Sequence, residues 1–240
     1  AAVMLVVAEN HRSLRAPVRA FLAGPEPPDG FFVNVNTRSG PLMTGRETIR
    51  IAGRAAVREN ALGSSFLISP DAFFQTNVGA AREVLRLVTA GVGSARRVLD
   101  LYSGAGLFTV PLAAAGAQVT AVEENAQSVD DAARNLRLNH IPASRARLIR
   151  GRVEDAMRRL ARERFDVVVL DPPRQGCVPA VLDAIAEDVR PARVVYVSCN
   201  PEALASDLTR LRSAGYAIDA LQAVDMFPHT EHIETVVTLT

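Results

Sequence analysis

The chain contains no tryptophan and no lysine, and it has only two cysteines among its 240 residues. Cys177 and Cys199 do not form a C-x-x-C pair, so we expect neither a metal site nor a structural disulfide. No apolar run is long enough to cross a membrane, and the first eight residues are too short and lack the basic flank of a secretory signal. We therefore expect a soluble, cytoplasmic, monomeric protein with no bound metal and no membrane partner.

Net charge is also scarce. The formal charge is only +1 at pH 7, which does not by itself indicate a nucleic-acid partner. All 27 residues in the combined count of lysine and arginine are arginine. Arginine suits bidentate phosphate contacts, but codon bias explains the same composition equally well. Residues 1–64 hold eight arginines against five acidic residues, so the excess positive charge lies at the amino end.

The hydrophobic content, 48%, is sufficient for a sizeable core. One large domain, or one domain with a partial companion, is expected. The chain begins without Met on a segment that is typical of a strand, which indicates that an upstream part is missing.

The most informative stretch is residues 97–115, RVLDLYSGAGLFTVPLAAA. A β-prone apolar run is followed by a glycine-containing loop and then by an Ala- and Leu-rich segment that suits a helix. A tight glycine loop at the carboxyl end of a strand is where open α/β sheets bind nucleotides. This stretch therefore predicts a nucleotide-like cofactor.

Two cofactors compete for this loop. A dinucleotide fingerprint needs a third glycine, but Thr109 occupies that position. Glu123, at the end of the next expected strand, would accept ribose hydroxyls in a dinucleotide or in S-adenosylmethionine (SAM). The D-x-x-x-G-x-G pattern of Asp100, Gly104 and Gly106 favours SAM.

Strands and helices alternate from residue 98 onward, which predicts a doubly wound, mostly parallel Rossmann-like sheet of the SAM methyltransferase type. The last two expected strands, 217–226 and 233–239, are joined by a loop too short for a helix and should form an antiparallel hairpin at the sheet edge. Strands are expected at 98–102, 118–123, 146–150, 165–170 and 193–198, with helices at 108–115, 126–139, 154–162, 178–187 and 202–213.

A small, partial α+β region is expected to precede this domain. Residues 1–8, 31–37, 48–57 and 65–68 have strand patterns, and residues 12–22 have apolar residues at helical spacing. DAFFQTN, at 71–77, is expected to open a helix that continues to residue 90. The predicted division is therefore 1–70 for the central region and 71–240 for the catalytic domain.

Several motifs lie at the ends of the expected elements. They are FFQTN (73–77), DLYSGAGLFTVPLA (100–113), DPPRQG (171–176), VSCNP (197–201) and FPHTEHIE (227–234). In this order they resemble the SAM-dependent RNA uracil C5-methyltransferases, which make 5-methyluridine in transfer and ribosomal RNA. The resemblance covers most of the chain from about Leu62.

The resemblance implies that Cys199 is the nucleophile and Glu234 the general base. It also implies a SAM cofactor, a tRNA or rRNA partner, and a pocket for the cofactor and the target base. The residues expected to line this pocket are Gln75, Tyr102, Gly104, Gly106, Glu123 and Asp171. Ser103 and Leu107 depart from the family pattern, where many members have Cys and Asn, and Leu107 could remove a polar cofactor contact.

The chemistry of uracil explains why a cysteine is needed. C5 is a poor nucleophile until a thiolate adds to C6, and after methylation a base must remove the C5 proton. Cys199 lies just before an expected helix start, where the helix dipole should favour the thiolate. Cys177 lacks such a context and is interpreted as structural.

Two other functions remain open at this stage. DPP at 171–173 resembles the motif of SAM-dependent methyltransferases that act on amines, although Arg174 stands where those enzymes place a stacking aromatic residue. A fragment that binds RNA without catalysis is the other alternative. His229 and His232 are interpreted as hydrogen-bonding or RNA-contact residues, because no Cys or third His lies nearby to complete a metal site.

Overall fold

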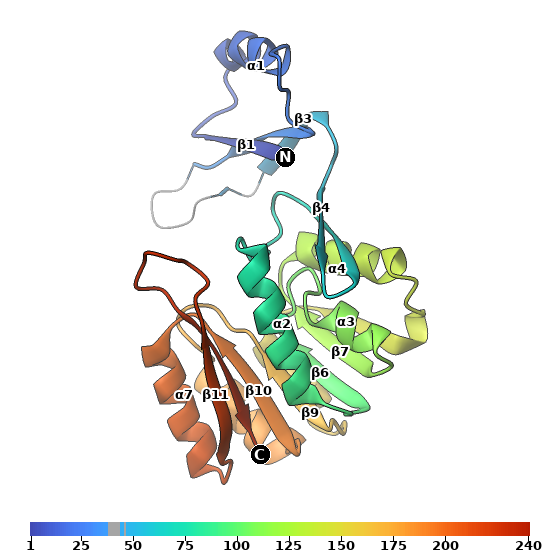
Figure 1. The fold of residues 1–240 in the computed structure, drawn as a ribbon, viewed down its shortest axis with the longest axis vertical. Coiled ribbons are helices and arrows are strands. Elements are labelled where there is room, and N and C mark those ends of the chain that lie inside the picture. The colour runs from blue at the N-terminus through green and yellow to red at the C-terminus, as the bar shows by residue number, and fades with distance from the viewer. Residues whose placement is uncertain (38–43, 46) are drawn as a thin grey trace.

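The computed structural model describes residues 1–37, 44–45 and 47–240. Its main body is a seven-stranded sheet of order β11-β12-β10-β9-β6-β7-β8, with helices on both faces (Figure 1). The strands are β6 (Arg97–Leu101), β7 (Gln118–Glu123), β8 (Ala146–Arg150), β9 (Val167–Leu170), β10 (Arg193–Ser198), β11 (Ile218–Val224) and β12 (Glu234–Leu239). The helices are α2 (Val78–Val92), α3 (Thr109–Ala114), α4 (Ala126–Leu138), η2 (Ala143–Arg145), α5 (Val153–Leu160), α6 (Pro179–Asp183), the π-helical η3 (Ala184–Val189) and α7 (Pro201–Ser213).

The central strands are apolar on both faces, which explains why they form the middle of the sheet. Val167–Leu170 is buried throughout, and β9 pairs in parallel with both β6 and β10. Alternate residues face two helical layers: Val169 packs with α2 and α3, whereas Val168 and Leu170 pack with α5, α6 and α7. The predicted doubly wound sheet is confirmed.

The edge of the sheet is an antiparallel hairpin, also as predicted. β12 pairs with β10 on one side and with β11 on the other, and β11 is the outer strand. The pairing of β11 shifts register between Ile218 and Ala220. Most of β11 is exposed.

The amino-terminal region builds a separate sheet of order β1-β2-β3, with α1 packed on one face. Its elements are β1 (Ala2–Val7), η1 (Arg12–Leu14), α1 (Arg15–Leu22), β2 (Gly30–Val35) and β3 (Glu47–Gly53). Val18 of α1 packs on Phe31 and Val33 of β2. Figure 1 shows this region at one end of the molecule, on the side where the β11–β12 loop and the start of α2 lie.

Two local predictions are wrong. The single strand expected at 48–57 is divided between β3 and β4 (Val57–Ala61), because Gly53, the last residue of β3, has a φ of +72°, outside the β region. Glycine is needed at this position, since a Cβ would lie 2.1 Å from the Asp29 carbonyl oxygen. The segment 71–77 is not helical. Helix α2 begins at Val78, and the Asn77 side chain caps it by accepting a hydrogen bond from the Ala80 amide.

The β4–β5 hairpin packs against helix α4 of the large sheet, although the hairpin precedes residue 70. β5 (Ser64–Ile68) and the following residue Ser69 are held by three polar side chains spaced four residues apart, two on α4 and one at its C-cap, which we call the α4 row. The pairs are Asp131 with Ser69, Asn135 with Leu67 and Asn139 with Ser65. The division of the chain at residue 70 stays a prediction.

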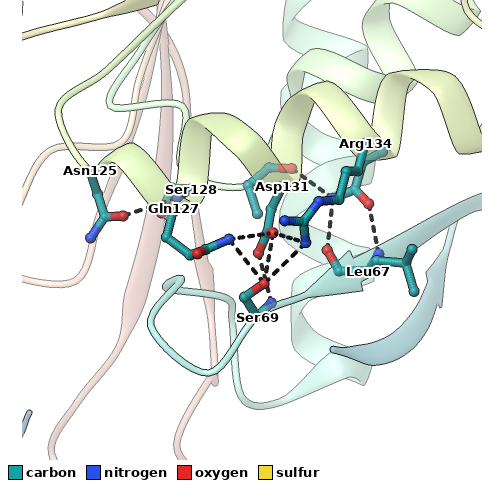
Figure 2. A network of polar contacts seen from close by, with 9 residues as sticks. Leu67, Ser69, Asn125, Gln127, Ser128, Asp131 and Arg134 are labelled. Carbon is teal, nitrogen blue, oxygen red and sulfur yellow. Dashed lines mark hydrogen bonds and ion pairs between the residues drawn. The ribbon is translucent and has the colours of Figure 1, made fainter. Parts of the chain in front are cut away.

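These pairs follow from matched repeats. Four residues of helix advance by about 6.0 Å and two residues of strand by about 6.6 Å, so every fourth helical side chain meets every second strand amide. Figure 2 shows the end of this row, where the Asp131 carboxylate accepts bonds from the Ser69 amide and hydroxyl, and Gln127 and Arg134 approach the same group.

Phe66 anchors the hairpin in the main core. Its side chain is fully buried among residues of α2, and its ring lies 5.5 Å from that of Phe74. Phe66→Ala should lower the free energy of unfolding by about 3–5 kcal/mol, measured by urea denaturation. Leu62→Ala, at the exposed turn of the same hairpin, is the control and should cost less than about 1 kcal/mol. Equal effects of the two variants would contradict the placement of Phe66.

Candidate functional site

The predicted site residues follow the ends of neighbouring strands at one rim of the sheet. Tyr102, Asp171 and Cys199 come directly after β6, β9 and β10, and Glu123 is the last residue of β7. Glu234 begins β12, which runs antiparallel to β10, so it lies at the same rim. Parallel pairing of β6, β7, β9 and β10, together with the antiparallel pairing of β12, therefore brings these five residues to one edge.

The loop after β6 is ordered by Glu123. One carboxylate oxygen of Glu123 accepts the Gly104 amide at 2.9 Å, and the other accepts the Asn125 amide at 2.7 Å. Gly106 has φ +89°, and a Cβ there would meet Val110 at 3.3 Å and Ala132 at 3.5 Å. The loop thus keeps its backbone open toward the rim while it packs closely on α3 and α4.

The buried carboxyl group of Asp100, on β6, is hydrogen-bonded to the first residue of α3, the helix that follows this loop. One oxygen of Asp100 accepts a hydrogen bond from the Thr109 hydroxyl at 2.5 Å. The other oxygen has no hydrogen-bond partner in the part of the chain that the structure describes. Burial, opposed by the Thr109 bond, raises the pKa of Asp100 to about 7. Thr109, at the place of the missing third glycine, thus ties the start of α3 to β6.

Cys199 lies between β10 and α7 and is partly buried. The side chain of Asn200 caps α7 through the Glu202 amide and donates to the Arg174 carbonyl oxygen at 2.9 Å. The expectation that the helix start lowers the pKa of Cys199 is wrong for the free protein. Desolvation, followed by the charges of Glu234 and Asp171, raises its pKa.

Glu234 and Asp171 are themselves shifted. Glu234 is 2% exposed, and desolvation raises its pKa to about 7. Burial, and then the charges of Glu234 and Asp100, raise the pKa of Asp171 well above its ordinary value. A thiol and two carboxyl groups of raised pKa are thus close enough to influence one another, which is an arrangement suited to proton transfer.

The FFQTN segment adjoins the same loop. A Cβ on Gly104 would lie 3.9 Å from the Phe73 carbonyl oxygen, and Gln75 is buried. Phe73 itself is 69% exposed, the most of any large apolar side chain described. Phe73 was not among the predicted site residues, although the doubled aromatic of FFQTN was a usable signal.

The two departures from the family pattern are both buried. Leu107 packs in the core beside α2 and α3, and Ser103 donates its amide to Val122 and accepts the Gly106 amide at its carbonyl. Leu107 therefore serves the packing of the loop.

Cys177 is part of a buried group that the sequence did not reveal. Its amide and the Tyr196 hydroxyl both donate to one oxygen of Asp207, at 2.8 and 2.5 Å. Burial raises the pKa of the Cys177 thiol to about 12, so it stays protonated. Asp207 occupies the otherwise apolar inner face of α7, with Leu204, Leu208 and Leu211, and this pattern could have identified it.

His229 and His232 lie in the loop between β11 and β12, shortly before Glu234 in the sequence. The His232 ring meets the Phe227 ring edge-on at a centroid distance of 6.1 Å, and His229 has φ +67°. Across the described ranges, no group of three or more His, Cys, Asp or Glu side chains could hold a metal ion. No helix among the residues placed by the structure has both the length and the apolar character needed to span a bilayer.

The raised pKa of Glu234 predicts a pH-dependent cost of folding. The folded value, about 7, exceeds the ordinary value of 4.5, so stability from this group is complete below pH 4.5 and is lost as pH rises through 7. Glu234→Gln should stabilise the protein at pH 8 by on the order of 1–3 kcal/mol and have little effect at pH 4.5. Urea denaturation at both pH values measures this, with Glu231→Gln, an exposed neighbour, as the control. A Glu234→Gln effect of the same size at both pH values would contradict the assignment.

Comparison with known proteins agrees with the motifs. The sequence profile of a family described as tRNA (Uracil-5-)-methyltransferase matches residues 46–240. An uncharacterized RNA methyltransferase of Gloeobacter violaceus is 42% identical over 212 residues, which cover 88% of this chain and 45% of that protein. A tRNA (uracil(54)-C(5))-methyltransferase of Pyrococcus abyssi is 35% identical over 212 residues, covering 88% of this chain and 49% of that protein.

Solved structures give the same result. The crystal structure of Pyrococcus abyssi tRNA (uracil-54, C5)-methyltransferase in complex with S-adenosyl-L-homocysteine has a TM-score of 0.82 and 32% identity, covering 100% of this chain and 56% of that chain. The present chain spans about half the length of the curated relatives that it matches. The family predicted from the motifs is confirmed: the chain belongs to the tRNA (uracil-5-)-methyltransferase family.

Proposed function

We propose that this chain is the catalytic part of a SAM-dependent RNA methyltransferase that methylates C5 of a uridine in tRNA or rRNA through a covalent cysteine adduct. The observation that carries the proposal is the antiparallel register of β10 and β12, in which Ser198 pairs with Thr235, so that Cys199 and Glu234 are the next residues of two adjacent strands. The charge of Glu234 contributes to the raised pKa of the Cys199 thiol, in agreement with this placement. The proposed division assigns residues 71–240 to catalysis. The relative from Pyrococcus abyssi, named for uracil 54 of tRNA, favours tRNA over rRNA.

The residues at the loop fit SAM. Each carboxylate oxygen of Glu123 accepts one backbone amide and retains lone pairs for the two ribose hydroxyls. The backbone around Gly104 and Gly106 gives a ligand close access, and Tyr102 and Asp171 border the same rim. When bound, SAM supplies an electrophilic methyl group on a sulfonium.

The protein's own groups then act in order on the uracil. The Cys199 thiol gives up its proton to solvent, its sulfur forms a bond to C6, and the C5–C6 π electrons move toward the C4 carbonyl, which makes C5 nucleophilic. C5 then bonds to the methyl group while the bond from that methyl group to the sulfonium sulfur breaks, and S-adenosyl-L-homocysteine is the leaving group. Glu234 removes the proton from C5, the C5–C6 double bond re-forms, and the thiolate leaves. A carboxyl group with a pKa of about 7 suits this step, because it accepts and releases a proton near neutral pH.

Attack on C6 requires that the base leave its stack, which costs least in a single-stranded loop. Phe73, whose backbone carbonyl lies beside the glycine loop, has an exposed side chain, and we propose that its ring offers an aromatic surface for a displaced base. Gln75, buried nearby, is proposed to contact the polar edge of the uracil. Methylation of an amine is the less favoured alternative, because the position after DPP is Arg174 and offers no aromatic ring for stacking.

The covalent step separates the two catalytic residues. Cys199→Ala should abolish both methyl transfer and any covalent RNA adduct, because C5 is never activated. Glu234→Gln should accumulate a methylated protein–RNA adduct, because the C5 proton stays in place. Denaturing gels with labelled SAM and a uridine-containing RNA measure both outcomes.

The matched control for this experiment is the second cysteine. Cys177→Ala should form and release the adduct as the wild type does, since the Cys177 side chain is buried whereas that of Cys199 is only partly buried. Loss of the adduct in Cys177→Ala, with retention in Cys199→Ala, would refute the proposed nucleophile.

The cofactor assignment has its own test. Glu123→Ala should weaken SAM binding tenfold or more, because it removes the proposed acceptor of the ribose hydroxyls and the acceptor of the Gly104 amide hydrogen bond. A tenfold loss corresponds to about 1.4 kcal/mol of binding free energy. Calorimetric titration gives the affinity. Glu124→Ala, which alters an exposed adjacent carboxylate, should leave it unchanged within twofold. Preference of the wild-type chain for NAD over SAM would exclude the assignment.

A further inference from the structure

The middle member of the α4 row, Asn135, differs from its neighbours because it also reaches the glycine loop. Its carboxamide oxygen accepts the Leu67 amide at 2.7 Å. Its nitrogen donates to the Leu67 carbonyl at 3.2 Å and to the Ala105 carbonyl at 3.0 Å. Asn135 is fully buried, so both N–H donors and the oxygen are used by the backbone of two separate segments.

The Ala105 carbonyl needs this partner. Ala105 is buried between Gly104 and Gly106, and an unpaired buried carbonyl would be costly. The Ala105–Gly106 peptide is thereby held at both ends, since the Gly106 amide donates to the Ser103 carbonyl at 2.9 Å. Without the Asn135 bond, the freedom of Gly106 would allow this peptide to rotate.

The orientation of the Asn135 amide is set by β5. Two of its three bonds go to Leu67, which turns the remaining N–H toward the loop. Asn139, one helical turn further on, bonds to the Ser65 amide and carbonyl in the same manner but has no bond to the loop. Asn139 also donates to the Asn135 backbone carbonyl at 2.7 Å, so it contacts the hairpin and α4, whereas Asn135 joins the hairpin to the loop.

We propose that Asn135 is a positioning residue for the cofactor loop, and that through it the β4–β5 hairpin forms part of the SAM site. The proposal rests on the proposed function for the identity of the cofactor. It predicts that hairpin docking and cofactor binding stabilise each other, because both depend on the same side-chain amide.

The test compares Asn135→Ala with Asn139→Ala. Asn135→Ala should weaken the binding of S-adenosyl-L-homocysteine about tenfold or more in calorimetric titration, and Asn139→Ala should change it less than about twofold. Hydrogen exchange of the Gly106 amide in the cofactor-free variants should be faster in Asn135→Ala only. Equal losses of affinity in the two variants, or normal Gly106 exchange in Asn135→Ala, would overturn the proposal.

Wild-type protein provides a second measurement that does not depend on the folding of a variant. S-adenosyl-L-homocysteine should slow exchange of the Leu67 amide, in the hairpin, together with that of the Gly106 amide. Protection of Gly106 alone would overturn the coupling. Failure of the wild type to bind the ligand would instead refute the proposed cofactor, whereas wild-type binding with equal binding by Asn135→Ala would refute only the role of Asn135.

Discussion

The fold depends on the parallel pairing of central strands that are buried on both faces. The apolar faces of β6, β9 and β10 can be buried only in the interior of a sheet that has helices on both sides. Parallel alignment then brings the carboxyl ends of these strands to one rim. The residues that follow those strands are brought together although they lie far apart along the chain. Antiparallel pairing of β12 adds Glu234 from the opposite chain direction.

The resulting proximity has an electrostatic cost. Asp100 and Glu234 are buried and Asp171 is partly buried, and the pKa values of all three carboxyl groups are raised, chiefly by desolvation. The same environment raises the pKa of Cys199 and outweighs the helix start that follows it. In the free protein this environment favours the protonated thiol over the thiolate.

Much of this arrangement was predictable from the sequence, because apolar runs and glycine turns report local structure directly. Continuous runs such as Val167–Leu170 predict central strands, and the motif residues fall at their ends. The α4 row was not predictable, because Asp131, Asn135 and Asn139 resemble solvent-exposed residues of an ordinary helix. Their partners are backbone groups of a distant strand, and backbone groups leave no mark on the side-chain pattern of residues 65–69. The pKa of Cys199 was missed for a related reason, since desolvation depends on packing that spacing does not encode.

The register shift in β11 has a consequence for behaviour at high concentration. β11 is the outer strand of the large sheet, with Leu221 55% exposed, and an outer strand can recruit a strand from another molecule. The irregularity between Ile218 and Ala220 breaks the even row of backbone donors and acceptors, and the charged Asp219 lies at that point. A recruited strand could therefore match only the remaining part of this edge, which limits growth of the sheet into an aggregate.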